Sequence, residues 1–126
     1  MFSVPPGFPS ILWRDRMVPP GSLVGPVQEN EFLELTCRVL GGWPTPTVTW
    51  WIGGKQITSE IGKQGTGTAD DQGVVWAILR LKAYRNIFQV PIICHAQTSD
   101  LVLPKTNAAS IDITCKFFIF GIENIK

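Results

Sequence analysis

The chain has 126 residues, of which 44% are hydrophobic and 17% charged, and this is enough for one domain with a single core. Its 11 basic and 10 acidic residues give a net charge of +1 without a polybasic stripe, so neither nucleic acid nor an anionic membrane surface is indicated as a partner. Twelve glycines, ten prolines and the lack of a long helical pattern favour a turn-rich, all-β protein.

The amino-terminal segment has the composition of a linker. Residues 1–15 lack the charged start, apolar stretch and small-residue cleavage site of a secretory signal, and three prolines fall within the first nine positions. We therefore expect residues 1–8 to be a linker or the end of a preceding region, and residues 9–116 to form the domain. We expect the chain to be a piece of a longer ectodomain, or an incomplete gene model, with its signal and anchor elsewhere.

Two strands are indicated on either side of a corner rich in glycine and proline. Period-two alternation runs from Leu33 to Leu40 and resumes after Pro46. The inward phase consists of Leu33, Leu35, Cys37 and Val39, followed by Val48, Trp50 and Ile52. Thr47, Thr49 and Trp51 take the outward phase of the second strand.

The second half of the chain predicts three more strands. Residues 59–73 are polar and contain four glycines, which predicts a flexible connection with at most short strands. A turn is expected from Tyr84 to Asn86. The inward residues of the three strands are Ala77, Leu79 and Leu81, then Ile92, Cys94 and Ala96, and finally Ile111 and Ile113.

The spacing of two cysteines and a tryptophan indicates the fold. Trp50 follows Cys37 by 13 positions and Cys94 follows Trp50 by 44, which is typical of an immunoglobulin sandwich. We predict a two-sheet, all-β sandwich of the constant or intermediate type, with about seven strands in Greek-key order. The predicted disulfide joins Cys37 and Cys94, leaves Cys115 unpaired, and indicates an oxidising, extracellular compartment. The predicted core includes Trp50, Leu35, Leu79 and Leu81.

Several motifs carry a resemblance to a known family. The first are Gly25-Pro26-Val27-Gln28-Glu29-Asn30, Leu33-x-Leu35-x-Cys37 and Gly41-Gly42-Trp43-Pro44-Thr45-Pro46-Thr47-Val48-Thr49-Trp50-Trp51. Downstream are Leu79-x-Leu81, Arg85-Asn86 and Cys94-His95-Ala96-Gln97. Together they span residues 9–114 and resemble an immunoglobulin domain of the arthropod sidestep and nephrin-like adhesion proteins. Ile92 stands where the tyrosine corner of other immunoglobulin domains has Tyr, and sidestep-like domains also tend to lack that Tyr.

The resemblance implies a function in recognition between cells. Such proteins are single-pass membrane adhesion receptors or ligands, and sidestep proteins are recognised by beaten-path immunoglobulin proteins in axon guidance. We therefore expect an extracellular module that binds a protein on the same or an opposing cell. Two alternatives are a soluble secreted immunoglobulin-type binding protein and a structural spacer domain.

The chain offers no convincing catalytic, metal or cofactor site, and we expect neither an enzyme nor a cofactor. Cys94 and His95 are neighbours in one strand and point to opposite faces, so they do not form a nucleophilic pair. The cysteines lack the short spacing of a zinc site. Asp70 and Asp71 are not followed by the series of further oxygen ligands that a calcium site requires. The glycines around Lys63 are in the wrong order for a phosphate-binding loop.

We expect the carboxyl-terminal residues 117–126 to be an apolar tail or a fragment junction. Their apolar run is far shorter than the ~20 residues that span a bilayer.

One outward face is a candidate for binding a protein. Trp51 follows core Trp50 and faces away from the disulfide, on the sheet that also carries Ile93, His95 and Gln97 outward. We predict Trp51 and Ile93 as an apolar centre, with His95, Gln97 and Lys55 as a polar rim. The alternative is that Trp51 is covered by the next strand or by the loop near Lys55. The same two interpretations apply to Trp76 and Ile78 on the opposite sheet.

Overall fold

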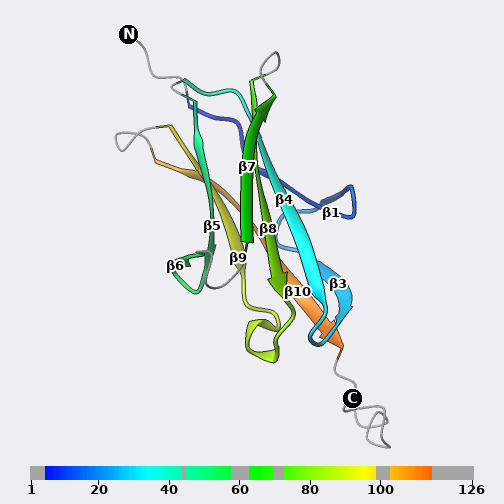
Figure 1. Cartoon of the computed structure of the whole chain (residues 1–126). Coiled ribbons are helices and arrows are strands. Elements are labelled where there is room, and N and C mark those ends of the chain that lie inside the picture. Colours follow the sequence, from blue (N-terminus) through cyan, green and yellow to red (C-terminus); the bar gives the residue numbers. More distant parts are fainter. Residues whose placement is uncertain (1–4, 44, 58–62, 70–72, 99–102, 115–126) are drawn as a thin grey trace, which may run out of the picture.

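The computed structural model describes residues 5–43, 45–57, 63–69, 73–98 and 103–114. Within these ranges the chain forms ten strands and one short 3-10 helix, η1 (Arg85–Ile87). The strands make two five-stranded sheets that face each other as two layers (Figure 1). This architecture confirms the predicted all-β immunoglobulin sandwich.

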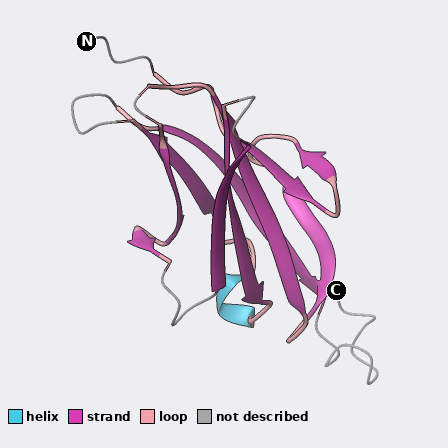
Figure 2. Ribbon diagram, turned by 45° about the horizontal axis from the view of Figure 1, so that its top comes forward, coloured by secondary structure: helices cyan, strands magenta, loops and turns pink. Residues whose placement is uncertain are grey.

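The first sheet is antiparallel throughout. Its order is β2 (Arg16–Val18), β1 (Ser10–Trp13), β4 (Phe32–Leu40), β8 (Val74–Lys82) and β7 (Lys63–Ala69). The second sheet has the order β3 (Leu23–Gln28), β10 (Lys105–Thr114), β9 (Ile92–Gln97), β5 (Thr47–Ile52) and β6 (Lys55–Gln56). In this sheet β3 runs parallel to β10, and the other neighbours are antiparallel. Figure 2 shows the two layers with η1 between β8 and β9 in the chain.

The core lies between the sheets and is built by the period-two alternation of the strands. In β4, β8 and β9 every second side chain is buried, in the phase that the sequence indicates. Leu35, Leu79 and Ile92 are fully buried, and no buried residue among those described is polar or charged. Ile52, at the end of β5, is half-buried and packs against the core.

The amino-terminal part of the chain contributes to both sheets. β1 pairs with β4 in the first sheet, whereas β3 crosses to the second sheet and pairs with β10. Gly25 permits this close approach, because a Cβ atom at this position would lie 2.5 Å from the carbonyl oxygen of Asp112. Upstream, Pro6 is buried and the Gly7 N–H donates to the carbonyl of Leu40 at 2.9 Å. Part of the segment predicted as a linker therefore packs on the domain.

Two strand predictions need correction. Residues 63–69, expected as a flexible connection with at most short strands, form the seven-residue strand β7, which pairs with β8 along its whole length. Pairing with a long neighbouring strand outweighs the low strand propensity of its two glycines. The described residues form ten strands, whereas about seven were expected. The short strands β2, β3 and β6 were not predicted because their sequences carry no clear alternation.

Candidate binding face

The disulfide and the buried tryptophan hold the two sheets together. Cys37 of β4 and Cys94 of β9 are joined, with their Cα atoms 6.5 Å apart. Trp50 lies directly opposite Cys94 in the β5–β9 ladder and is fully buried. Its Nε1–H donates to the carbonyl oxygen of Ala77 at 3.3 Å, and Ala77 lies opposite Cys37 in the other sheet. The indole therefore packs beside the disulfide and forms a second link between the sheets.

Trp51 lies on the outer face of the second sheet, where its ring is held by two neighbours. Its Nε1–H donates to Thr49 Oγ1 at 2.8 Å. The ring stacks on His95 with centroids 4.9 Å apart and an angle of 31° between the planes. His95 is opposite Thr49 and thus diagonal to Trp51, a position from which large side chains make contact across strands. A partner would therefore meet the apolar ring of Trp51, since its N–H group is already bonded.

Ile93 completes the centre of this face. It is directly opposite Trp51 in β9, and on its other side it is opposite Ala108 of β10. His95 is similarly flanked by Thr106. Both β10 residues have small side chains, so they cover little of the Ile93 and His95 side chains. Gln97 lies at the end of β9 opposite Thr47.

Lys55 does not belong to this face, and the prediction that placed it in the polar rim is wrong. Gly53 and Gly54 have φ values of 58° and 81° and form the two-residue turn of a hairpin. This turn sets Gln56 opposite Trp51 and Lys55 opposite Ile52, on the other side of the strand pair. Directly opposite residues share a face, so Gln56 replaces Lys55 beside Trp51.

The binding face consists of the outward residues of β5, β6 and β9 together with the two β10 residues that lie opposite His95 and Ile93. They are Thr47, Thr49, Trp51, Gln56, Ile93, His95, Gln97, Thr106 and Ala108. This set contains no Asp, Glu, Lys or Arg. His95 is its titratable group, and partial burial lowers the pKa of this imidazole below its ordinary value of 6.5. The face is therefore uncharged at neutral pH.

Gln56, Thr106 and Ala108 were not predicted from the sequence as members of this face. The Gly53-Gly54 pair is a hairpin signal that predicts both β6 and its register. The alternation of Thr106, Ala108 and Ser110 extends the last strand backward, but small and polar residues make a weak strand pattern.

The remaining sequence candidates are scattered. Trp76 and Ile78 are half-buried on the outward side of β8, and Trp43 is 51% exposed in the corner before β5. Asp70, Asp71, Cys115 and the apolar tail lie outside the described residues. Within the described part of the chain, no group of three or more His, Cys, Asp or Glu side chains is placed to hold a metal ion.

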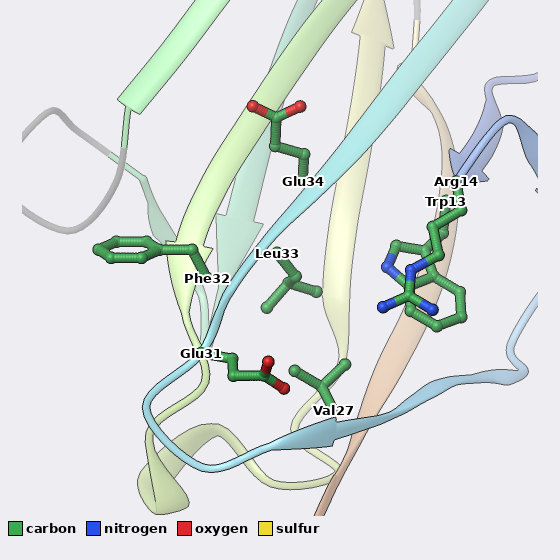
Figure 3. Close-up of a pocket in the computed structure, with 7 residues that line it drawn as sticks. All are labelled: Trp13, Arg14, Val27, Glu31, Phe32, Leu33 and Glu34. Atoms are coloured by element: carbon green, nitrogen blue, oxygen red, sulfur yellow. The ribbon is translucent and has the colours of Figure 1, made fainter.

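A groove of about 290 Å³ lies where β1 and β3 approach the start of β4. Figure 3 shows Leu33 and Val27 between the Trp13–Arg14 pair on one side and Glu31 with Phe32 on the other. The Arg14 guanidinium lies 4.4 Å from the centre of the Trp13 ring. Glu31 Oε1 accepts the Gln28 N–H at 2.8 Å. The lining of the groove contains no serine, threonine, cysteine or histidine, so the groove offers no nucleophile of these types.

The two-sheet sandwich with its inter-sheet disulfide and buried tryptophan defines an immunoglobulin domain. The profile of the CD80-like C2-set immunoglobulin domain matches residues 17–105. The chain belongs to this family.

Known proteins similar to the chain include cell adhesion molecules. Cell adhesion molecule 1 of Mus musculus is 29% identical over 86 residues, which are 64% of this chain and 18% of that protein. The ectodomain structure of mouse nectin-like molecule 4 is 20% identical, with a TM-score of 0.67 over 90% of this chain and 35% of that one. A complex of Dpr2 Ig1-Ig2 with DIP-Theta Ig1-Ig3 gives 16% identity and a TM-score of 0.62, over 84% of this chain and 32% of that one.

The chain thus resembles cell adhesion molecules in sequence and in fold, and it spans less than a fifth of the length of the curated relative. Among the described residues, no helix has the length and apolar character needed to cross a membrane.

Proposed function

We propose that this domain is an extracellular recognition module of a sidestep-like cell-surface adhesion protein, and that it binds a protein partner through the binding face. The observation that carries the proposal is the contact between Trp51 and His95 beside Ile93 on an uncharged sheet face. Aromatic side chains surrounded by uncharged polar residues are typical of the centre of a protein interface.

The physical state of Trp51 supports a role in binding. Its ring is fixed by the hydrogen bond to Thr49 and by the stacking on His95. Less side-chain entropy is lost when a partner contacts a ring that is already immobile. The half-burial of Trp51 also fits the alternative that the ring only closes this side of the sheet, in which case the domain is a spacer.

The family and the relatives support the class of partner. The chain matches a C2-set immunoglobulin domain and resembles Cell adhesion molecule 1, and the similar Dpr2 structure is a complex with another immunoglobulin protein. We propose an immunoglobulin protein of the beaten-path or nephrin-like kind as the partner, in cell adhesion or axon guidance. The extracellular location follows from the same proposal, with a single-pass anchor elsewhere in the whole protein.

A cell-surface binding screen against beaten-path-like and nephrin-like ectodomains tests this function. We expect Trp51→Ala and Ile93→Asp to weaken the interaction that the screen finds, and Lys55→Glu to leave it unchanged because Lys55 is on the other side of the hairpin. Circular dichroism and thermal unfolding establish that each variant is folded. A partner that binds both face variants as tightly as the unchanged chain would contradict the face, and the absence of any partner would favour the spacer.

A further inference from the structure

The outer side of the first sheet carries a cluster in which cations lie on aromatic rings. The Arg80 guanidinium is 4.5 Å from the centre of the Phe32 ring. The Lys82 ammonium is 5.7 Å from the Phe32 ring and 5.7 Å from the Tyr84 ring, so it bridges the two aromatics. Phe32 and Tyr84 are 58% and 50% exposed. We call these four residues the cation–aromatic cluster.

The two cations of the cluster keep their charge available to solvent. Arg80 is directly opposite Glu34 in the β4–β8 ladder, yet its guanidinium lies on Phe32 and forms no ion pair with a described carboxylate. An aromatic ring attracts a cation without cancelling its charge. Arg85 behaves differently, because its Nε donates to Glu29 Oε2 at 2.8 Å.

Two neighbouring carboxylates already have other bonding partners. Glu29 is paired with Arg85, and Glu31 accepts the backbone N–H of Gln28. Figure 3 shows the Glu31 carboxylate pointing toward Val27 and the Phe32 ring projecting to the opposite side. Among the described residues, Glu34 is then the remaining acid beside the cluster, against the two cations Arg80 and Lys82.

The two outer faces of the sandwich therefore differ in chemistry. The binding face has no Asp, Glu, Lys or Arg, and Asp112 follows beyond it in the outward phase of β10. The outward positions of β4 and β8 instead carry Arg38, Arg80 and Lys82 with Glu34 as their described acid. The chain also contains no Asn-x-Ser/Thr sequence, so no N-linked glycan of its own would cover either face.

We propose that the cation–aromatic cluster binds a sulfated polysaccharide of the cell surface or extracellular matrix. The cations cover the ring faces, so the cluster presents fixed positive charge, whereas the centre of a protein interface is apolar and poor in Lys. A chain of closely spaced sulfates matches two cations separated by two positions of one strand, about 7 Å apart along β8. Phe32 holds both cations in place, which reduces the entropy lost on binding.

Surface plasmon resonance of the full chain on immobilised heparin tests this site over a series of salt concentrations. We expect Arg80→Gln/Lys82→Gln to weaken binding by about tenfold and to lower the slope of log affinity against log salt by about two, one for each lost cation. Phe32→Ser leaves the net charge unchanged, so we expect weaker binding by about threefold with the same salt slope.

Lys105→Gln is the matched control. Lys105 also lies on an aromatic ring, with its ammonium 4.8 Å from the centre of Phe8, but it belongs to the second sheet. This variant removes one positive charge and one cation–aromatic pair away from the cluster, and we expect it to keep its heparin affinity within about twofold. Thermal unfolding of every variant establishes that losses of binding are not losses of structure.

Three results overturn the proposal. The first is that the unsubstituted chain does not bind heparin. The second is that Lys105→Gln loses as much heparin affinity as the double variant. The third is tighter binding to poly-glutamate peptide, to phosphatidylserine vesicles or to desulfated heparin than to heparin, which would assign the cluster to an acidic protein, a membrane or a neutral glycan. None of these measurements depends on the binding face, so the proposed function is tested separately.

Discussion

At the scale of single residues, the two adjacent tryptophans have opposite environments. Trp50 is fully buried beside the disulfide and donates to the Ala77 carbonyl, whereas Trp51 is half-buried on the outer face. Strand geometry causes this difference, because successive side chains point to opposite faces of a sheet. Both orientations are therefore predictable from the alternation of the strand alone.

Replacement of these tryptophans separates core from surface. We expect Trp50→Ala to lower the free energy of unfolding by about 3 to 5 kcal/mol, because it leaves a cavity in the core. Trp51→Ala removes fewer buried contacts, and we expect about 1 kcal/mol. Urea unfolding followed by circular dichroism measures both values. Equal and large losses at the two positions would show that the faces of β5 are misassigned.

His95 links stability to pH. It is the sole histidine of the chain, and burial lowers its pKa in the folded state below the ordinary value of 6.5. Between these two pKa values the unfolded chain binds more protons than the folded chain, so stability falls as the pH drops below about 6.5 and levels off below the folded pKa.

Nuclear magnetic resonance of the His95 ring gives the folded pKa directly, and urea unfolding between pH 5 and about 8 gives the stability. We expect His95→Gln to flatten the part of the pH dependence that lies just below the ordinary histidine pKa. A folded pKa above the ordinary value would reverse the sign of this effect and contradict the environment described for the ring.

At the scale of elements, strands with strong alternation were predictable and short or glycine-rich strands were not. β4, β5, β8 and β9 alternate apolar and polar residues, and the sequence located each of them. The β1–β2 hairpin turns at Arg14 and Asp15, with φ values of 52° and 62°. Such turns usually contain glycine or asparagine, so this one gives no recognisable signal.

The residues of the binding face were predictable where they lie on strands with clear alternation. Trp51, Ile93 and His95 followed from the phases of β5 and β9, because these strands alternate clearly. The assignment of Lys55 failed because a register depends on the number of residues in the turn, and a shift of one residue moves a side chain to the other face.

The glycines of the β5–β6 turn provide a test at this scale. Both have positive φ angles, and an added Cβ atom at either position would meet no atom within 4 Å. Asparagine tolerates this backbone conformation, and we expect Gly53→Asn to change stability by less than about 0.5 kcal/mol or to raise it slightly. We expect Gly54→Val to cost about 1 to 2 kcal/mol through backbone strain alone.

Thermal unfolding of both turn variants measures these changes. Since neither side chain would clash, a large loss for Gly53→Asn would indicate that the turn has another geometry. The Gly54→Val variant should also weaken partner binding, because it loosens the strand that places Gln56 beside Trp51.

At the scale of the whole molecule, the disulfide makes a large contribution to stability. Cys37 and Cys94 are 57 positions apart, and closing a loop of this length stabilises the folded state by about 4 kcal/mol in the chain-entropy model. Small domains have total stabilities of about 5 to 15 kcal/mol. We therefore expect the reduced protein, or the Cys37→Ala/Cys94→Ala variant, to be close to unfolding at 37 °C.

Urea unfolding with and without a reductant measures this contribution. The oxidised and reduced forms should differ in midpoint, and the reduced form should have the steeper slope with urea because its unfolded chain is less compact. Coincident midpoints would mean that the packing around Trp50 stabilises the sandwich without the covalent link.

The crossing of the amino-terminal part from one sheet to the other has a mechanical consequence. The first and last described residues lie at opposite ends of the sandwich (Figure 1), and β3 runs parallel to β10 beside the carboxyl end. A pulling force along the long axis would slide β3 past β10 and would load their hydrogen bonds together, on both sides of the irregularity between Ile111 and Ile113. Bonds that share a load in this way break in one step at high force. In the proposed adhesion role the domain would resist tension until that step, and single-molecule pulling should record one sharp rupture instead of gradual unravelling.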